Sequence, residues 1–343
     1  MQRRTFNRNL LLALLSAPLL GATAQKSRSR PKKTLPVPRL KKGDTIGLIT
    51  PGSFISDEGL EKAVKNVEEL GFKVKLGKNI RKKRGFNAGT DAERLSDLHE
   101  MFGDPQVQGI WCARGGYGTT RLLPGLDFKF IRKHPKALIG YSDITALLNA
   151  IHSATGMVGF HGPVASSTMT DYTREHFMRI LTEEHRGYVI HPLEREEEKV
   201  SAPLHRPGRA TGKLTGGNLT LLAALAGTPW QPEYRKALVF IEEIGEKPYR
   251  IDRMLTQIRE SSRIAEAAGI ALGAFNDCQP DADDLSLSLE ETLADRLLPL
   301  GKPLACGLSF GHIQNQCTLP IGVRATLQAE EGSITLEESG TAK

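Results

Sequence analysis

The chain has 343 residues, which is long enough for two domains that each bury a core of their own. Its hydrophobic content of 39% and charged content of 25% are those of an ordinary globular protein and exclude a largely disordered chain. The formal net charge is +7, but eight positive charges and no acidic residue fall within residues 1–33. The remaining chain is nearly neutral, which removes the main argument for a nucleic-acid partner.

The first 24 residues have the three parts of a secretory signal peptide: a basic start, a short apolar run and small residues before a cleavage point. The apolar run is too short to cross a bilayer, so no stable membrane span is expected after cleavage. Arg3 and Arg4, followed by Phe6, are typical of a twin-arginine signal, with a Sec signal or an uncleaved anchor as alternatives. Residues 25–40 then form a basic linker.

Strand and helix patterns alternate over residues 41–167, which predicts an open α/β domain with a parallel sheet and right-handed crossovers. Strands are expected over 42–51, 72–76, 108–113, 137–139 and 159–163, and helices over 57–70, 90–103 and from 144 onward. Ligands of such sheets bind beyond the carboxyl ends of the strands.

Residues 168–207 are interpreted as an interdomain connection that contains one helix, over 172–182. A second domain is expected over 208–332 and a tail over 333–343. Within the second domain the patterns predict helices over 219–225 and 250–260, and strands over 237–241, 269–275, 304–310 and 325–329.

The four cysteines lack the C-x-x-C spacing of zinc and redox sites, so no metal site is predicted. In an exported protein Cys306 and Cys317 are the one close pair that could form a disulfide, and isolated buried thiols are the alternative.

Residues 136–152 combine a short buried strand, an abrupt turn and an apolar helix, with Ser142 in the turn. A serine at a strand-to-helix turn has the geometry of a nucleophile elbow, which holds Oγ clear of the backbone near a helix N-terminus. Ile144 stands where the usual G-x-S-x-G pattern has its second glycine, and a plain helix cap is the alternative interpretation. Ser142 is therefore the first candidate nucleophile.

The neighbouring strand is expected to end in the glycine-rich loop 114–118, beside the elbow. Glycines permit close approach of a ligand and can present N–H groups as oxyanion donors. A phosphate cradle is the competing function, but neither G-x-x-x-x-G-K-[ST] nor G-x-G-x-x-G is present at the first strand turn. A turn that binds nothing is the third interpretation.

Seven motifs occur in order between Lys41 and Leu327, at residues 50–53, 111–118, 139–145, 161–163, 214–219, 240–255 and 307–312. As an ordered set they resemble the LD-carboxypeptidases of peptidase family S66 and the related microcin C self-immunity peptidases. The resemblance implies a flavodoxin-like or glutaminase-like parallel-sheet domain followed by a smaller, β-rich α/β domain. It also implies a homodimer and a site that uses neither metal nor cofactor.

The family's catalytic triad, shared between the domains, maps onto Ser142 as nucleophile, Glu242 as acid and His312 as base. Chemically, the histidine takes the serine proton while the carboxylate holds the imidazole in its tautomer. The N–H of Asp143, directly after the nucleophile, is one expected oxyanion donor, and an N–H of either Gly115 or Gly116 on the adjacent strand is the second. Arg114 and Tyr141 are candidates for substrate binding. The residues themselves leave one rival for each role: His161 as base, Glu243 as acid and Cys112 as nucleophile.

The function implied is release of D-alanine from the murein tetrapeptide, at its bond to meso-diaminopimelate. The export signal departs from the cytoplasmic members of the family and predicts a periplasmic enzyme acting on peptidoglycan, with endopeptidase action on cross-linked murein as an extension. Three alternatives stand: a self-immunity peptidase that cleaves peptidyl nucleotides, a catalytically silent murein-binding protein, and a nucleotide-binding flavodoxin-like domain.

Overall fold

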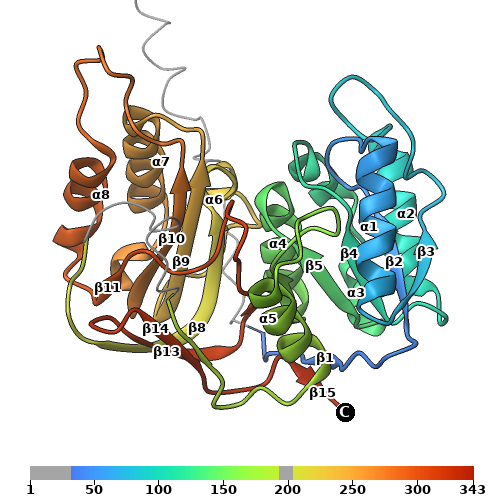
Figure 1. Ribbon diagram of the computed structural model, residues 1–343. Coiled ribbons are helices and arrows are strands. Elements are labelled where there is room, and N and C mark those ends of the chain that lie inside the picture. Colours follow the sequence, from blue (N-terminus) through green and yellow to red (C-terminus); the bar gives the residue numbers. More distant parts are fainter. Residues whose placement is uncertain (1–31, 193–203) are drawn as a thin grey trace, which may run out of the picture. The chain divides into compact units, whose positions relative to one another are not determined.

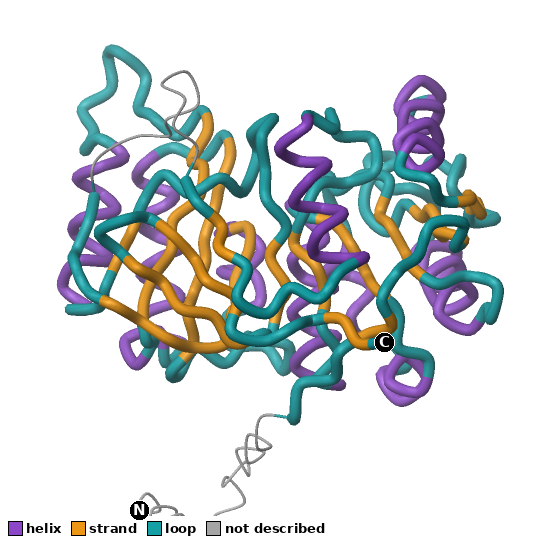
Figure 2. Tube along the Cα trace, turned by 60° about the horizontal axis from the view of Figure 1, so that its bottom comes forward, coloured by secondary structure: helices purple, strands orange, loops and turns teal. Residues whose placement is uncertain are grey.

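The computed structural model describes residues 32–192 and 204–343, which belong to one compact unit (Figures 1 and 2). The predicted signal peptide and residues 25–31 of the predicted linker lie outside the described residues. Among the described residues, no helix combines the length and the apolar character that a membrane crossing requires.

The first sheet has six strands in the order β12-β6-β5-β4-β2-β3. Five are parallel: β2 (Thr45–Ile49), β3 (Lys73–Leu76), β4 (Gly109–Cys112), β5 (Ala137–Gly140) and β6 (Gly159–His161). Its helices are α1 (Asp57–Glu69), α2 (Asp91–Gly103), α3 (Phe128–Lys133) and α4 (Thr145–Thr155). Strands β4 and β5 are fully buried, as apolar central strands of a parallel sheet should be. The predicted parallel α/β domain is confirmed.

The predicted helix starts of this domain rest on local hydrogen bonds. The Ser56 hydroxyl caps α1 by accepting the N–H of Gly59, and Thr90 and Glu93 form a capping box at α2. Helix α4 ends at Gly156, whose φ of 79° is the left-handed conformation that suits glycine at a helix end.

The second sheet has seven strands in the order β11-β10-β9-β8-β13-β14-β7. Strands β8 (Arg209–Asn218), β9 (Ala237–Ile244), β10 (Gly269–Asn276) and β11 (Leu304–Ala305) are parallel, whereas β13 (Arg324–Gln328), β14 (Ser333–Leu336) and β7 (Val189–Ile190) continue antiparallel. Its helices are α6 (Leu219–Leu225), α7 (Pro248–Ser261) and α8 (Leu289–Leu297). Helix α5 (Asp171–Thr182) instead packs against the first sheet, where the ring of its Phe177 lies 4.4 Å from that of Trp111 in β4 between centroids. A second, sheet-rich α/β part is thereby confirmed.

The predicted segment boundaries need correction at three points. The tail predicted at 333–343 contributes β14, and its Thr341–Ala342 (β15) pairs with Val37–Pro38 (β1) of the predicted linker. The predicted connection 168–207 contributes β7. Finally, β12 (Leu319–Ile321), from the predicted second domain, pairs with β6 at the edge of the first sheet. Backbone pairing between distant segments decides these boundaries, and local composition carries no trace of it.

The two sheets meet through α4 and β8. The N–H of Asn218 donates to Thr145 Oγ1 at 3.1 Å, and the Asn149 side chain donates to the carbonyl of Gly216 at 2.9 Å. A Cβ on Gly217 would lie 2.5 Å from Thr145 Oγ1, so glycine is what lets β8 approach the helix this closely. The helix that begins beside Ser142 is therefore bonded directly to the second sheet.

Candidate active site

Ser142 occupies a strained position between β5 and α4. Its φ is 61°, in the left-handed region, which costs a non-glycine residue about 1 kcal/mol or more. A short 3₁₀ turn, Ser142–Ile144, then leads into α4. The predicted strand-to-helix elbow is present, and it places the hydroxyl at the carboxyl end of the first sheet.

The glycine-rich loop after β4 lies directly against this elbow. A Cβ on Gly115 would meet Ser142 Cβ at 3.1 Å and Ser142 Oγ at 3.4 Å. The Gly115 carbonyl accepts the N–H of Ser53 at 2.9 Å, which fixes the loop. Gly116 instead approaches Ser53, because a Cβ on this glycine would lie 2.4 Å from the serine Cβ. Of the two glycines considered as oxyanion donors, Gly115 is the one adjacent to the hydroxyl.

The side chain of Asp143 joins the elbow to the same loop. It is buried, and its Oδ2 accepts the N–H of Thr119 at 2.9 Å while the Thr119 hydroxyl donates to the Asp143 carbonyl at 2.5 Å. Burial raises the pKa of this carboxyl, and the Thr119 and Gly118 N–H groups partly oppose that effect. The residue whose N–H is the predicted first oxyanion donor is thereby held rigidly. No sequence pattern indicated this side-chain role.

Glu242 and His312 form a hydrogen-bonded pair. Nδ1 of His312 lies 2.8 Å from Oε2 of Glu242, and the glutamate side chain is 0% exposed whereas the histidine side chain is 15% exposed. Because a carboxylate can only accept, Nδ1 carries the proton and Nε2 is left as the basic nitrogen. The predicted acid and base are therefore together in the folded chain.

Their position relative to the elbow follows from three contacts. Glu242 pairs with Asn218 across β8 and β9, and Asn218 is bonded to Thr145 at the start of α4. The Tyr141 ring, next to Ser142, lies 4.8 Å from the His312 ring between centroids. Strand ends of both sheets thus meet around Ser142.

Glu243, the rival acid, has a different partner set. It accepts hydrogen bonds from the Asn218 side chain at 3.0 Å and from the N–H and hydroxyl of Thr220 at 2.8 Å each. These bonds satisfy the first turn of α6, and burial raises the pKa of this carboxyl. The pleat of β9 therefore sends Glu242 toward His312 and Glu243 toward a helix start.

His312 is carried by a glycine-containing loop, which corrects the strand predicted over 304–310. Strand β11 ends at Ala305, and Gly307 and Gly311 then adopt φ values of 80° and 109°. A Cβ on Gly311 would lie 2.8 Å from Glu242 Cβ, so only glycine lets the chain pass the glutamate here. The Asn276 side chain, at the end of β10, donates to the His312 carbonyl. The sequence analysis did not single out Asn276, although a polar residue at the end of a predicted strand could have indicated a role in the site.

His161 and Cys112 do not match the roles of base and nucleophile. His161 is 1% exposed, neither ring nitrogen has a hydrogen-bond partner among the described residues, and burial lowers its pKa to about 4. Cys112 is fully buried, and burial raises the pKa of its thiol. Cys306 and Cys317 are not joined by a disulfide.

Of the two predicted substrate-binding residues, Arg114 is exposed and donates from Nη1 to the carbonyl of Phe54 at 2.8 Å. Tyr141 is half-buried, and burial raises the pKa of its hydroxyl, with Gln316 and Ser167 as hydrogen-bonding neighbours that oppose the shift. Within residues 32–192 and 204–343 no group of three His, Cys, Asp or Glu side chains is arranged to hold a metal ion.

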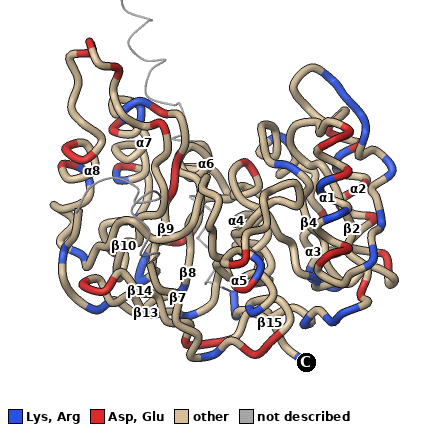
Figure 3. Tube along the Cα trace, in the orientation of Figure 1, with Lys and Arg blue, Asp and Glu red and all other residues tan. Residues whose placement is uncertain are grey.

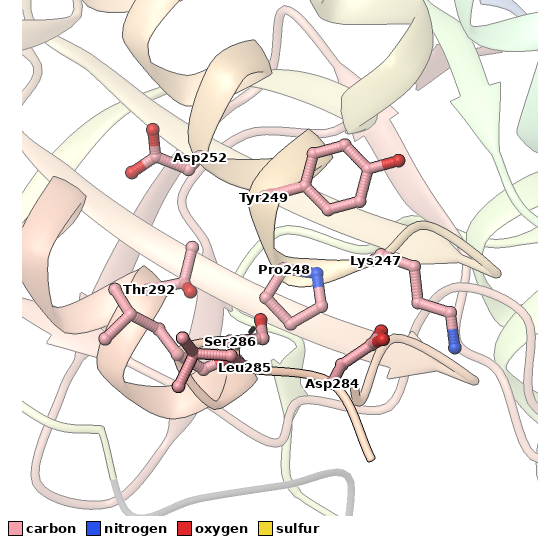
Figure 4. Close-up of a pocket in the computed structure, with 9 residues that line it drawn as sticks. Lys247, Pro248, Tyr249, Asp252, Asp284, Leu285, Ser286 and Thr292 are labelled. Atoms are coloured by element: carbon pink, nitrogen blue, oxygen red, sulfur yellow. Dashed lines mark hydrogen bonds between the residues drawn. The ribbon is translucent and has the colours of Figure 1, made fainter. Parts of the chain in front are cut away.

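A pocket of about 510 Å³ lies at the N-terminus of α7 (Figure 4). Tyr249, Asp252 and Asp284 are among the side chains that line it, together with Lys247 and the exposed Leu285. None of the predicted triad or oxyanion residues lines this pocket.

Family models match both halves of the chain. The LD-carboxypeptidase N-terminal domain matches residues 46–162 and the LD-carboxypeptidase C-terminal domain matches residues 211–327. A curated relative, the probable murein peptide carboxypeptidase of Bacillus subtilis, is 43% identical over 305 residues, which are 87% of this chain and 93% of that protein.

Two solved structures are also similar. The muramoyltetrapeptide carboxypeptidase of Oxalobacter formigenes matches with a TM-score of 0.75 and 32% identity, over 85% of this chain and 97% of that one. The self-immunity protein MccF, in complex with glutamyl sulfamoyl guanosine, matches with a TM-score of 0.81 and 26% identity, over 90% of this chain and 100% of that one.

Proposed function

Since the chain belongs to the LD-carboxypeptidase family, we propose that it is a serine LD-carboxypeptidase that releases the terminal D-alanine from murein tetrapeptides in peptidoglycan remodelling or recycling. The observation that carries the proposal is the 2.8 Å bond between a buried Glu242 and His312, next to a serine held in a strained elbow. The names of the relatives supply the substrate class.

The proposed reaction begins at Ser142. Its hydroxyl attacks the carbonyl of diaminopimelate while Nε2 of His312 takes the proton, and Glu242 stabilises the imidazolium that results. The oxyanion is stabilised by the N–H of Asp143 and by an N–H of the Gly115 loop. His312 returns the proton to the leaving amine of D-alanine, and water then cleaves the acyl-enzyme by the reverse proton path.

The test is D-alanine release from purified murein tetrapeptide, with Ser142→Ala as the matched control. Wild type is expected to release D-alanine and the variant is not. A wild-type protein that releases no D-alanine contradicts the proposal and leaves a catalytically silent murein-binding protein. An alanine variant as active as wild type also contradicts it, because hydrolysis would then not depend on Ser142. Cross-linked and glycan-attached murein, assayed in parallel, test the endopeptidase extension.

A second candidate is a self-immunity peptidase that acts on peptidyl nucleotides, supported by the similarity to MccF. The predicted export signal argues against it, because such substrates arise inside the cell. Hydrolysis of an aminoacyl sulfamoyl nucleoside faster than that of the tetrapeptide would favour this alternative.

We further propose that the protein is periplasmic and acts as a homodimer, which rests on the signal-peptide pattern of residues 1–24 and on the family resemblance. Cell fractionation with and without Arg3→Lys/Arg4→Lys tests a twin-arginine route, because a Sec signal tolerates that change. Sedimentation measures the oligomeric state.

A further inference from the structure

The loop between β3 and α2 carries five cations between residues 78 and 84 (Figure 3). Three of them have carboxylate partners: Lys78 with Glu100, Arg81 with Asp57, and Lys82 with Glu93. Within the described part of the chain, Lys83 and Arg84 form no ion pair, and Lys83 acts on Glu58 only at longer range. Two cations of this loop are therefore exposed without a close counter-charge.

A chain of contacts connects the unpaired part of the loop with the nucleophile. Lys83 Nζ is 5.3 Å from the centroid of the Phe54 ring, and the Arg114 guanidinium carbon is 6.0 Å from the same centroid. Both are cation–π contacts, so the two cations share one ring. Arg114 directly precedes Gly115, which abuts Ser142. A continuous path of contacts thus leads from the nucleophile to Lys83.

The loop is also fastened to the glycine-rich loop. Phe86 and Tyr117 form an edge-to-face pair with ring centroids 5.0 Å apart, although both side chains are more than half exposed. Asn87 bridges to Ser53, and the Ser53 hydroxyl accepts the N–H of Tyr117 at 3.0 Å. These contacts hold the loop, and with it the cations, in a fixed position relative to the glycine-rich loop.

We propose that Lys83, Arg84 and Arg114 bind the carboxylates of the murein stem peptide that lie upstream of the scissile bond. This inference rests on the proposed function. Lys83 and Arg114 share the Phe54 ring, Arg84 follows Lys83 directly in the chain, and none of the three has an ion-pair partner among the described residues. Such a group of cations forms a site for an acidic ligand, and the stem peptide carries carboxylates on its glutamate and diaminopimelate residues. The substrate would extend from Ser142 across Phe54, and the site would select acidic over amidated stem peptides.

The chain offers a matched control in the same loop. Lys83→Gln/Arg84→Gln removes the two unpaired charges, whereas Lys78→Gln/Lys82→Gln removes two charges that already have carboxylate partners. Exposed ion pairs are each worth little, so we expect KM for the tetrapeptide to rise about 3- to 10-fold in the first variant, with kcat within about twofold of wild type. The control variant keeps the wild-type KM.

Two further measurements sharpen the test. Wild type is expected to discriminate against a tetrapeptide amidated at its glutamate carboxylate, and Lys83→Gln/Arg84→Gln should lose that discrimination. Added NaCl should lower kcat/KM less in this variant than in wild type, because the screened charges are gone.

Equal KM values in wild type and Lys83→Gln/Arg84→Gln, or an equal loss in the control variant, would overturn the proposal. Calorimetric binding of the tetrapeptide to Ser142→Ala, with and without Lys83→Gln/Arg84→Gln, separates it from the proposed function. If wild type hydrolyses nothing yet this binding depends on the two cations, the proposed reaction fails and the carboxylate site stands.

Discussion

The carboxyl ends of β5 and β9 position their functional side chains by different physical means. At the end of β5 the backbone is strained, and the functional group is a short hydroxyl on a residue with a φ of 61°. At the end of β9 the backbone stays extended, and two long carboxylates leave it on opposite faces, both buried. At β5 the backbone conformation positions the hydroxyl, whereas at β9 hydrogen-bond partners position the carboxylates.

The difference shows what each position tolerates. A strained residue keeps its place because the surrounding chain fixes it, so its side chain can change without loss of the fold. A buried carboxylate is held by its hydrogen bonds, so its replacement disturbs whichever partner it serves. Glu242 is hydrogen-bonded to His312, and Glu243 accepts a hydrogen bond from the first turn of α6.

The largest effect is expected at the end of β5. Ser142→Ala should lower kcat for D-alanine release by about 10⁴- to 10⁶-fold, because it removes the nucleophile and leaves only binding and oxyanion stabilisation. The melting temperature should stay near that of wild type, since the change removes a single oxygen atom from a half-buried side chain. Steady-state kinetics and calorimetry check the two halves of this expectation, and a variant that fails to fold would show that the hydroxyl is structural.

The two glutamates of β9 should separate activity from stability. Glu242→Gln is expected to lower kcat by about 10²- to 10⁴-fold, because the amide no longer stabilises the imidazolium or fixes its tautomer. Glu243→Gln should leave kcat within about threefold and lower the free energy of unfolding by about 1–3 kcal/mol, through lost bonds to Thr220 and Asn218. Chemical denaturation beside kinetics measures both. If Glu243→Gln lost activity and Glu242→Gln lost only stability, Glu243 would be the catalytic acid and Glu242 the structural carboxylate.

A pH effect on stability is expected at His161, which pairs with Gly140 of β5 and lies near Glu242. Burial lowers its pKa to about 4, below the value near 6.5 of an unfolded chain. The unfolded state therefore binds a proton first as the pH falls, and this histidine costs about 3 kcal/mol of stability between pH 6.5 and pH 4. His161→Phe should flatten that part of the profile, measured by denaturant unfolding at each pH. Parallel profiles for the two proteins would contradict the expectation.

How much the sequence could predict differs between the two strand ends. The β5 end is a local pattern of strand, turn and helix, so Ser142 could be singled out from contiguous residues. At β9 the alternation of side chains indicated that Glu242 and Glu243 point apart, but only the packed sheet decides which one faces His312. The choice between Gly115 and Gly116 as oxyanion donor likewise could not be made from the sequence, because it depends on the distance between the glycine-rich loop and the elbow.

Strand β8, which the sequence patterns did not predict, shows a second limit of sequence-based prediction. Its glycines are typical of a loop, yet a Cβ on Gly216 would lie 1.8 Å from the carbonyl oxygen of Phe240, so glycine is required for this strand to lie against β9. The helix beginning at Leu219 was predictable because its pattern is local and apolar. Contacts between segments distant in sequence account for β8, β14 and the β1–β15 pair alike.

The smallest expected effect isolates the strain at the end of β5. Ser142→Gly and Ser142→Ala both lack the nucleophile, but only glycine adopts a φ of 61° without penalty. Glycine also gains freedom in the unfolded chain, which offsets part of the relief, so the net difference should be about 0.5–1 kcal/mol in favour of Ser142→Gly over Ser142→Ala. Paired urea unfolding curves resolve a difference of this size. If the alanine variant were the more stable, the strain at Ser142 would be smaller than the entropic cost of glycine in the unfolded chain, and the elbow would not be a store of strain.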